Sequence, residues 1–171
     1  MDKLVNALLI GDYTDALKQL DRLHQAGTVE QLRVQTRRDP ARSATVAELC
    51  FYMGRNDEAR GLLERYARMW EASPAKFQTA MEATTARAWL QVVEYFYSLG
   101  RYETAEALAR ATLERARQSA DHLGGAEASY YLMRIFRRLH QYREVEDHYH
   151  SAIEGFSKSS AVEKNDGIVR Q

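Results

Sequence analysis

Few residues of this sequence have the types and spacing that catalysis or metal binding requires. The single cysteine, Cys50, lies on the apolar side of a helical pattern with Val46 and Leu49, which predicts a core residue rather than a nucleophile. His148 and His150 are two positions apart, so a helix would point them to different faces, whereas helical metal pairs use i, i+4 spacing. We therefore expect no catalytic residue, no metal site and no cofactor, and hence a protein that is not an enzyme.

The composition limits the classes of partner. The 171 residues include 24 Lys and Arg against 24 Asp and Glu, so the formal net charge is 24 − 24 = 0. A neutral chain lacks the long-range attraction on which non-specific nucleic-acid binding depends. No apolar run approaches the ~20 residues that a membrane span needs, and one cysteine cannot form an internal disulfide. We expect a cytoplasmic protein that binds neither nucleic acid nor membranes.

The elements that must carry any binding residues are helical. Trp89, Val93 and Phe96 recur at the spacing that puts them on one helix face, and no stretch alternates as a strand does. Pro40 and Pro74 each stand between helical stretches, where proline marks a connection. The prediction is an all-α chain with helices at about 2–10, 13–25, 28–38, 42–53, 57–72, 76–98, 103–121, 125–139 and 142–156.

Four stretches of the chain share one shape: an apolar helix, a tight turn and a second helix. Their turns align on Gly11, Gly54, Gly100 and His140, at spacings of 43, 46 and 40 residues. A glycine just past a helix end adopts the left-handed conformation that caps the last carbonyls, and we expect His140 to replace such a glycine. Self-similarity at a period of this length is typical of a solenoid.

The residues that follow each turn have physical roles in a helix pair. Asp57 and Glu103 are predicted to favour the N-terminus of the second helix. Ala105 is small, which lets two antiparallel helices approach closely. The rings of Tyr102 and Tyr142 are predicted to pack against the neighbouring helix.

This pattern resembles the tetratricopeptide repeat. The motif Gly-x-Tyr-x-x-Ala stands intact at two turns, Gly11/Tyr13/Ala16 and Gly100/Tyr102/Ala105, and Trp89 matches the family's large aromatic in the first helix. The resemblance implies a right-handed superhelix of antiparallel helix pairs, with about four pairs in one domain over residues 1–157 and a frayed tail at 158–171. The spacings exceed the common ~34 residues and look like those of long-helix arrays in bacterial regulators.

The resemblance also implies a binding groove lined by the first helix of each pair. The matching positions are Ala44, Glu48, Phe51, Tyr52, Arg87, Leu90, Glu94, Tyr97, Ser98, Tyr130, Arg134, Arg137 and Arg138. The glutamates lie toward the N-terminal half and the last three arginines toward the C-terminal end. We therefore predict a scaffold that binds a protein or peptide segment, with an acidic part of that segment near the arginines. In the other interpretation, the aromatic residues fill interfaces between helix pairs and the arginines are merely solvated.

Three further hypotheses stay open at this point. The array could be the signal-sensing segment of a bacterial transcription regulator. Nucleic acid could bind to Arg134, Arg137, Arg138 and Arg143, although the neutral charge argues against it. A solenoid also needs polar caps, because each pair buries its faces against its neighbours. Apolar residues near the start, Leu4, Leu8 and Leu9, have little before them to shield them, so we expect self-association through an uncapped end.

Overall fold

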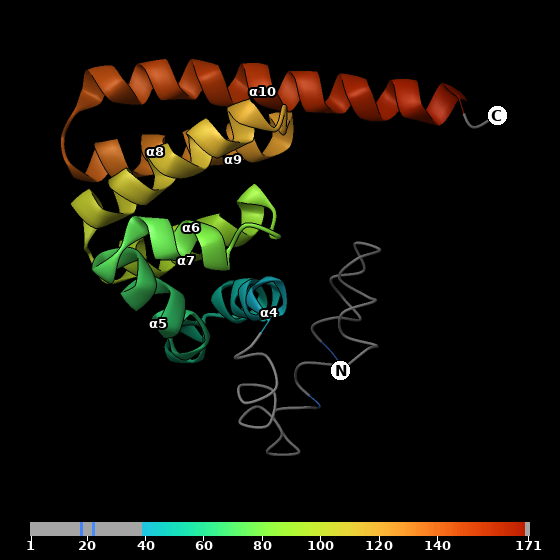
Figure 1. Ribbon diagram of the computed structural model, residues 1–171. Helices are drawn as coiled ribbons and strands as arrows, with labels where there is room; N and C mark the ends of the chain where they lie inside the picture. Colours follow the sequence, from blue (N-terminus) through green and yellow to red (C-terminus); the bar gives the residue numbers. More distant parts are fainter. Residues whose placement is uncertain (1–17, 19–21, 23–38, 170–171) are drawn as a thin grey trace. The chain divides into compact units, whose positions relative to one another are not determined.

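The computed structural model describes residues 18, 22 and 39–169, with side chains up to residue 159. In that part of the chain all regular structure is helical, which confirms the all-α prediction (Figure 1). The chain divides into two compact units, Met1–Ala83 and Thr84–Gln171. The first predicted turn, at Gly11, and the apolar residues Leu4, Leu8 and Leu9 lie outside the described residues.

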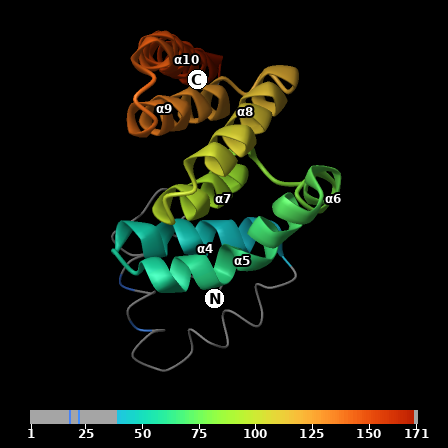
Figure 2. The same cartoon turned by 90° about the vertical axis from the view of Figure 1, so that its left-hand side faces the viewer.

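The first unit contains α4 (Pro40–Tyr52), α5 (Asn56–Ala72) and α6 (Pro74–Ala80). Helices α4 and α5 lie side by side (Figure 2). The carboxylate of Asp39 accepts a hydrogen bond from the backbone N–H of Arg42 at 3.1 Å, which caps the start of α4 just before Pro40. Gly54 has a φ of +71° between the two helices, as predicted for a glycine past a helix end.

The predicted helix over 76–98 is wrong, because two helices occupy this range. Helix α6 ends at Ala80, and α7 begins only at Ala86. The side chain of Phe77 is fully buried, with its ring edge-on to that of Trp70 at 5.5 Å between centroids. Buried Phe77 and Met81 thus hold α6 on the first unit. The sequence hides the break, because neither glycine nor proline stands between α6 and α7.

The second unit contains two helix pairs. They are α7 (Ala86–Ser98) with α8 (Tyr102–Gln118), and α9 (His122–Arg138) with α10 (Tyr142–Val169). Gly100 has a φ of +72° and His140 a φ of +59°, so the prediction that His140 replaces a glycine cap is confirmed. The carboxylate of Asp121 caps α9 by accepting from the N–H of Gly124 at 2.8 Å.

The last helix is longer than the sequence pattern predicted. Helix α10 continues to Val169 rather than ending near residue 156, and Figure 1 shows it extending past α9. The two helices cross closely at Gly155, where a Cβ atom would lie 2.8 Å from the Cβ of Ala126. The frayed tail at 158–171, the four-pair domain over 1–157 and the right-handed superhelix all stay predictions.

The two tyrosines after the turns behave differently. The ring of Tyr102 contacts that of Tyr97 on α7 edge-on at 5.4 Å, which confirms the predicted packing. The prediction for Tyr142 is wrong, because its ring is exposed and its hydroxyl lies 3.1 Å from Nδ1 of His140. The histidine that replaces glycine in this turn gives Tyr142 a polar partner outside the helix interface.

Candidate partner-binding site

An ion pair joins the first helices of the two pairs in the second unit. Nη1 of Arg134 on α9 lies 2.9 Å from Oε2 of Glu94 on α7, and the two side chains are only 29% and 17% exposed. The guanidinium lies 4.4 Å from the ring centroid of Tyr97 and 5.1 Å from that of Tyr131. Tyr130 is farther, at 5.9 Å. Arg134 is therefore enclosed by three aromatic rings and one carboxylate.

The surroundings keep the charge on Arg134 despite its burial. Desolvation disfavours the guanidinium cation, but the charge and hydrogen bond of Glu94 outweigh this and raise the pKa of Arg134 above its usual value. The ion pair with Glu94 compensates the charge of Arg134 and links α9 with α7.

A second arginine contacts the same aromatic ring from the outer side. Nε of Arg138 donates a hydrogen bond to the hydroxyl of Tyr97 at 3.1 Å, and Arg138 is itself exposed. This contact raises the pKa of Arg138. A guanidinium has five N–H donors, so most donors of Arg138 stay available to a ligand. Arg137 is also exposed, and Tyr130 is about half exposed.

The buried side of α7 fixes the direction of these side chains. Trp89, Val93 and Phe96 are buried, and the guanidinium of Arg115 on α8 lies 4.9 Å from the Trp89 ring centroid. With that side of the helix held, the 3.6-residue period brings Glu94 and Tyr97 to the side that contacts α9.

The family comparison agrees with this architecture. The model of the tetratricopeptide repeat family matches residues 84–158, which begin where the second unit begins. Residues 84–158 belong to the tetratricopeptide repeat family. The helices of the described part, packed in adjacent pairs, fit a tetratricopeptide array. No curated protein and no solved structure matches the chain.

Five of the predicted groove residues come together in the tetratricopeptide unit: Glu94, Tyr97, Tyr130, Arg134 and Arg138. Arg87 is half-buried on the first turn of α7, and Arg137 stands exposed in the last turn of α9. In the first unit, Glu48 is half-buried on α4 and Tyr52 is largely exposed at the end of that helix. The structure thus brings five of the predicted residues together in the second unit, where Arg87 and Arg137 lie on the same two helices, and it places Glu48 and Tyr52 on α4 of the first unit.

Two expectations about the groove need correction. Ala44 and Leu90 are almost fully buried, so they cannot line an open groove. Glu94 and Arg134 were expected toward opposite ends of the groove, but they form an ion pair across adjacent helices. Helices α7 and α9 are neighbours, so the charges that the sequence separates by one repeat meet in space.

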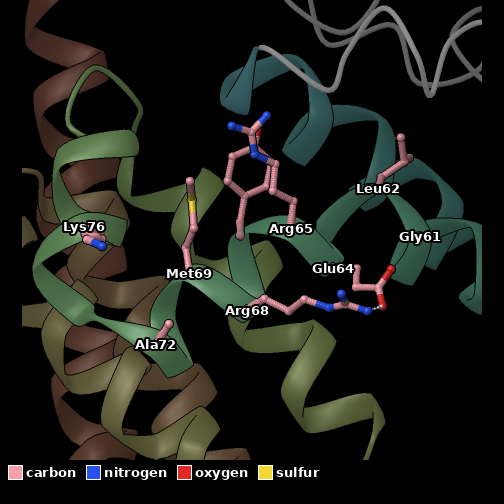
Figure 3. Close-up of a pocket in the computed structure, with 9 residues that line it drawn as sticks. Gly61, Leu62, Glu64, Arg65, Arg68, Met69, Ala72 and Lys76 are labelled. Atoms are coloured by element: carbon pink, nitrogen blue, oxygen red, sulfur yellow. Dashed lines mark hydrogen bonds and ion pairs between the residues drawn. The ribbon is translucent and has the colours of Figure 1, made fainter.

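The first unit contains a cavity that was not predicted from the sequence, shown in Figure 3. Its volume is about 550 Å³, and α5 and α6 line it with Gly61, Leu62, Glu64, Arg65, Tyr66, Arg68, Met69, Ala72 and Lys76. Arg68 forms an ion pair with Glu64 along the helix. The spacing of Arg65, Arg68 and Ala72 gives them one helix face, which is a signal that the sequence does contain. The pair of Arg68 and Glu64 joins neighbouring turns of α5, as ion pairs on solvated helix faces do.

Cys50 lies in the core, as its place in the helical pattern predicted. Cys50 is buried, and burial together with the nearby carboxylate of Glu58 raises the pKa of its thiol to about 11. The thiol therefore stays protonated near neutral pH, as a core residue should. Among the residues that the structure describes, no three His, Cys, Asp or Glu side chains gather as metal ligands would. In the same part of the chain, no helix combines the length and apolarity of a membrane span.

Proposed function

We propose that this protein is a non-enzymatic scaffold that binds a protein or peptide segment on the face formed by α7 and α9. The contacts of Tyr97 carry the proposal, because its ring lies against Arg134 while its hydroxyl positions the exposed Arg138. Tetratricopeptide arrays generally bind proteins and are typically non-catalytic, which supports a binding role for this face.

An acidic segment is the ligand that this face fits best. Arg138 and Arg137 are exposed in the last turn of α9, and planar guanidinium groups pair with carboxylates through two parallel hydrogen bonds. Tyr130, about half exposed, offers an aromatic surface beside them. Since Arg134 is engaged by Glu94, Arg138 is the residue that we expect to contact the ligand most directly. The competing interpretation is that Arg137 and Arg138 only favour the C-terminus of α9.

Several parts of the proposal rest on the sequence pattern alone. Arg87 on α7, and Glu48 and Tyr52 on α4 of the first unit, are further partner-binding residues of the same proposal. A cytoplasmic location and self-association belong to the same proposal. The alternative of a regulatory segment in a bacterial transcription regulator rests on the repeat spacing and would require a small signal or inhibitory partner.

A peptide-display selection on the full chain tests the proposed ligand face. We expect acidic sequences to be enriched. The substitution Arg138→Glu should lower the affinity for the selected peptides on the order of tenfold or more, as loss of a charged anchor does. Arg143→Glu is the matched control, because Arg143 is also exposed but lies on α10. Selection of peptides without acidic residues, or equal binding by both variants, would refute this assignment. Thermal melting of each variant verifies its fold.

A further inference from the structure

The two helix pairs of the second unit are copies of one another at an offset of 40 residues. Helix α7 ends at Ser98 and α9 at Arg138, and α8 begins at Tyr102 and α10 at Tyr142. The left-handed residues of the two turns, Gly100 and His140, keep the same offset. A residue of the first pair can therefore be compared directly with the residue 40 positions later.

In the first pair, one face is covered by the helix that follows. Helix α9 packs on both α7 and α8. A Cβ atom on Gly125 of α9 would lie 3.8 Å from Cβ of Ala116 and 3.9 Å from Cδ1 of Leu113. The apolar residues of this first pair are at most 8% exposed: Leu90, Ala109, Leu113 and Ala116.

The equivalent face of the second pair has exposed side chains. The residues 40 positions later are all apolar or aromatic and are between 39% and 49% exposed: Tyr130, Tyr149, Ile153 and Phe156. No helix of the described range covers them. Exposed side chains of this size on adjacent helices form an apolar patch, and such patches mark interaction surfaces. We call these four residues the α9/α10 patch.

We infer that a second copy of this chain docks on the α9/α10 patch. The aromatic residues favour a second copy over a further helix pair packed as α9 packs on the first pair. The reason is that Tyr149 and Phe156 stand where the first pair has Ala109 and Ala116. Small residues in the first pair allow a close approach of α9, whereas large rings hold a further helix at a greater distance. Aromatic side chains are enriched in interfaces between subunits.

The charges at the edges of the patch suit a two-fold arrangement. Arg137 lies at the C-terminal end of α9, and Glu146 is exposed near the N-terminal end of α10. A two-fold axis parallel to the helices lays α9 along α10 of the second copy. It then brings each Arg137 toward Glu146 of the second copy, so the surface is self-complementary in both shape and charge.

The size of the patch predicts a moderate affinity. Fully buried aromatic side chains contribute roughly 150–250 Å² each, so four half-exposed residues supply on the order of 400 Å² per copy. Stable dimers bury about 800 Å² per partner, and polar residues around the patch would supply the rest. We therefore expect a dimer that forms at micromolar concentration. The dimer face shares Tyr130 and Arg137 with the ligand face. The two proposals are distinguished by Arg138, which belongs to the ligand face alone, and by Ile153 and Glu146 on α10, which belong to the dimer face alone.

Sedimentation equilibrium of the full chain at micromolar concentrations tests the inference. We expect a dimer, and we expect Ile153→Asp to weaken dimerisation on the order of tenfold or more. Leu99→Asp is the control, because Leu99 is 44% exposed against 49% for Ile153 but lies outside the patch. A monomeric mass for the unmodified chain, or equal behaviour of both variants, would overturn the inference.

A charge swap provides a second test, which stays valid even if Ile153→Asp destabilises the fold. Arg137→Glu and Glu146→Arg should each weaken the dimer, and the double variant should restore it. Failure of the double variant to recover the dimer would rule out the proposed two-fold pairing. Because peptide binding is judged with Arg138→Glu, the ligand face and the dimer face can fail separately.

Discussion

The pair α7/α8 and the pair α9/α10 have the same backbone design but different surroundings. Both pairs turn through a left-handed residue, at Gly100 and at His140, and their helices align at an offset of 40 residues. The first pair buries its apolar face under α9, whereas the side chains on the equivalent face of the second pair are 39% to 49% exposed and no described helix packs on them. The difference lies in the side chains, since Ala116 is small and its equivalent, Phe156, is a large ring.

The same face of a helix pair is thus used for internal packing in one repeat and is exposed to a binding partner in the next. In a solenoid each pair contacts only its neighbours, so a face that loses its neighbour becomes a surface. Glu94 is engaged by Arg134 of the next pair, while Arg137, at the position of Tyr97 one repeat later, stands exposed. Residues at matching positions therefore differ in role according to what packs on them.

Exchanging the side chains at the matching positions should give the largest effect. Ala116→Phe places a ring where Gly125 of α9 lies close by, so we expect it to lower the free energy of unfolding by roughly 1–3 kcal/mol. Phe156→Ala should lower it by less than about 0.5 kcal/mol, because Phe156 is partly exposed. Urea unfolding of each variant, at a concentration where the chain is monomeric, measures both values. Equal losses of unfolding free energy in the two variants would contradict the claim that Ala116 packs under α9 while Phe156 lies on an exposed face.

The ion pair between α7 and α9 should give a smaller effect. A double-mutant cycle with Glu94→Ala and Arg134→Ala should yield a coupling energy of about 1 kcal/mol, since both side chains are only partly exposed. The same cycle with Glu94→Ala and Arg137→Ala should be additive, because Arg137 has no contact with Glu94 in the structure. Coupling in the second cycle as large as in the first would contradict the assignment of Arg134 as the partner of Glu94.

The smallest expected effect concerns the packing of α10 and depends on pH. The ring of His148 stacks on Phe136 of α9 at 5.4 Å between centroids, and its buried Nδ1 has no hydrogen-bond partner among the residues that the structure describes. Burial lowers the pKa of His148, and Arg110 and Arg117 of α8 act in the same direction against the carboxylates of Asp147 and Glu106. The imidazole of His148 therefore takes up a proton more readily in the unfolded chain than in the folded one. The contribution of His148 to the free energy of unfolding is consequently highest above about pH 6.5 and falls as the pH drops below that value.

The variant His148→Phe isolates this contribution, because it keeps a ring on Phe136 and removes the titration. We expect the stability of the unmodified chain to fall more than that of the variant between neutral and mildly acidic pH, as measured by urea unfolding. A parallel fall in both proteins would show that other groups cause the pH dependence.

Much of the helical framework follows from the sequence because its signals are local. The turns at Gly54, Gly100 and His140 were predicted, since a left-handed cap depends on the residues next to it. The break between α6 and α7 was not predicted, because buried Phe77 and Met81 fix it through tertiary contacts rather than through a glycine or proline.

The candidate site was predictable only in part for a similar reason. The helical period puts Tyr97 with Glu94, and Arg134 with Arg138, on common faces of their helices. The pairing of Glu94 with Arg134 depends on how α7 and α9 align in space, which no single helix pattern contains. The exposure of Tyr142 depends likewise on its contact with His140.

Hydroxyl-radical footprinting, read by mass spectrometry at increasing protein concentration, tests most directly the claim that the equivalent faces are used differently. Tyr130 and Tyr149 should become protected as the concentration rises, because a second copy covers the α9/α10 patch. Tyr97 should keep the same reactivity, since it lies in the contact between α7 and α9 at every concentration. Constant reactivity of Tyr130 and Tyr149 across the micromolar range would contradict the account.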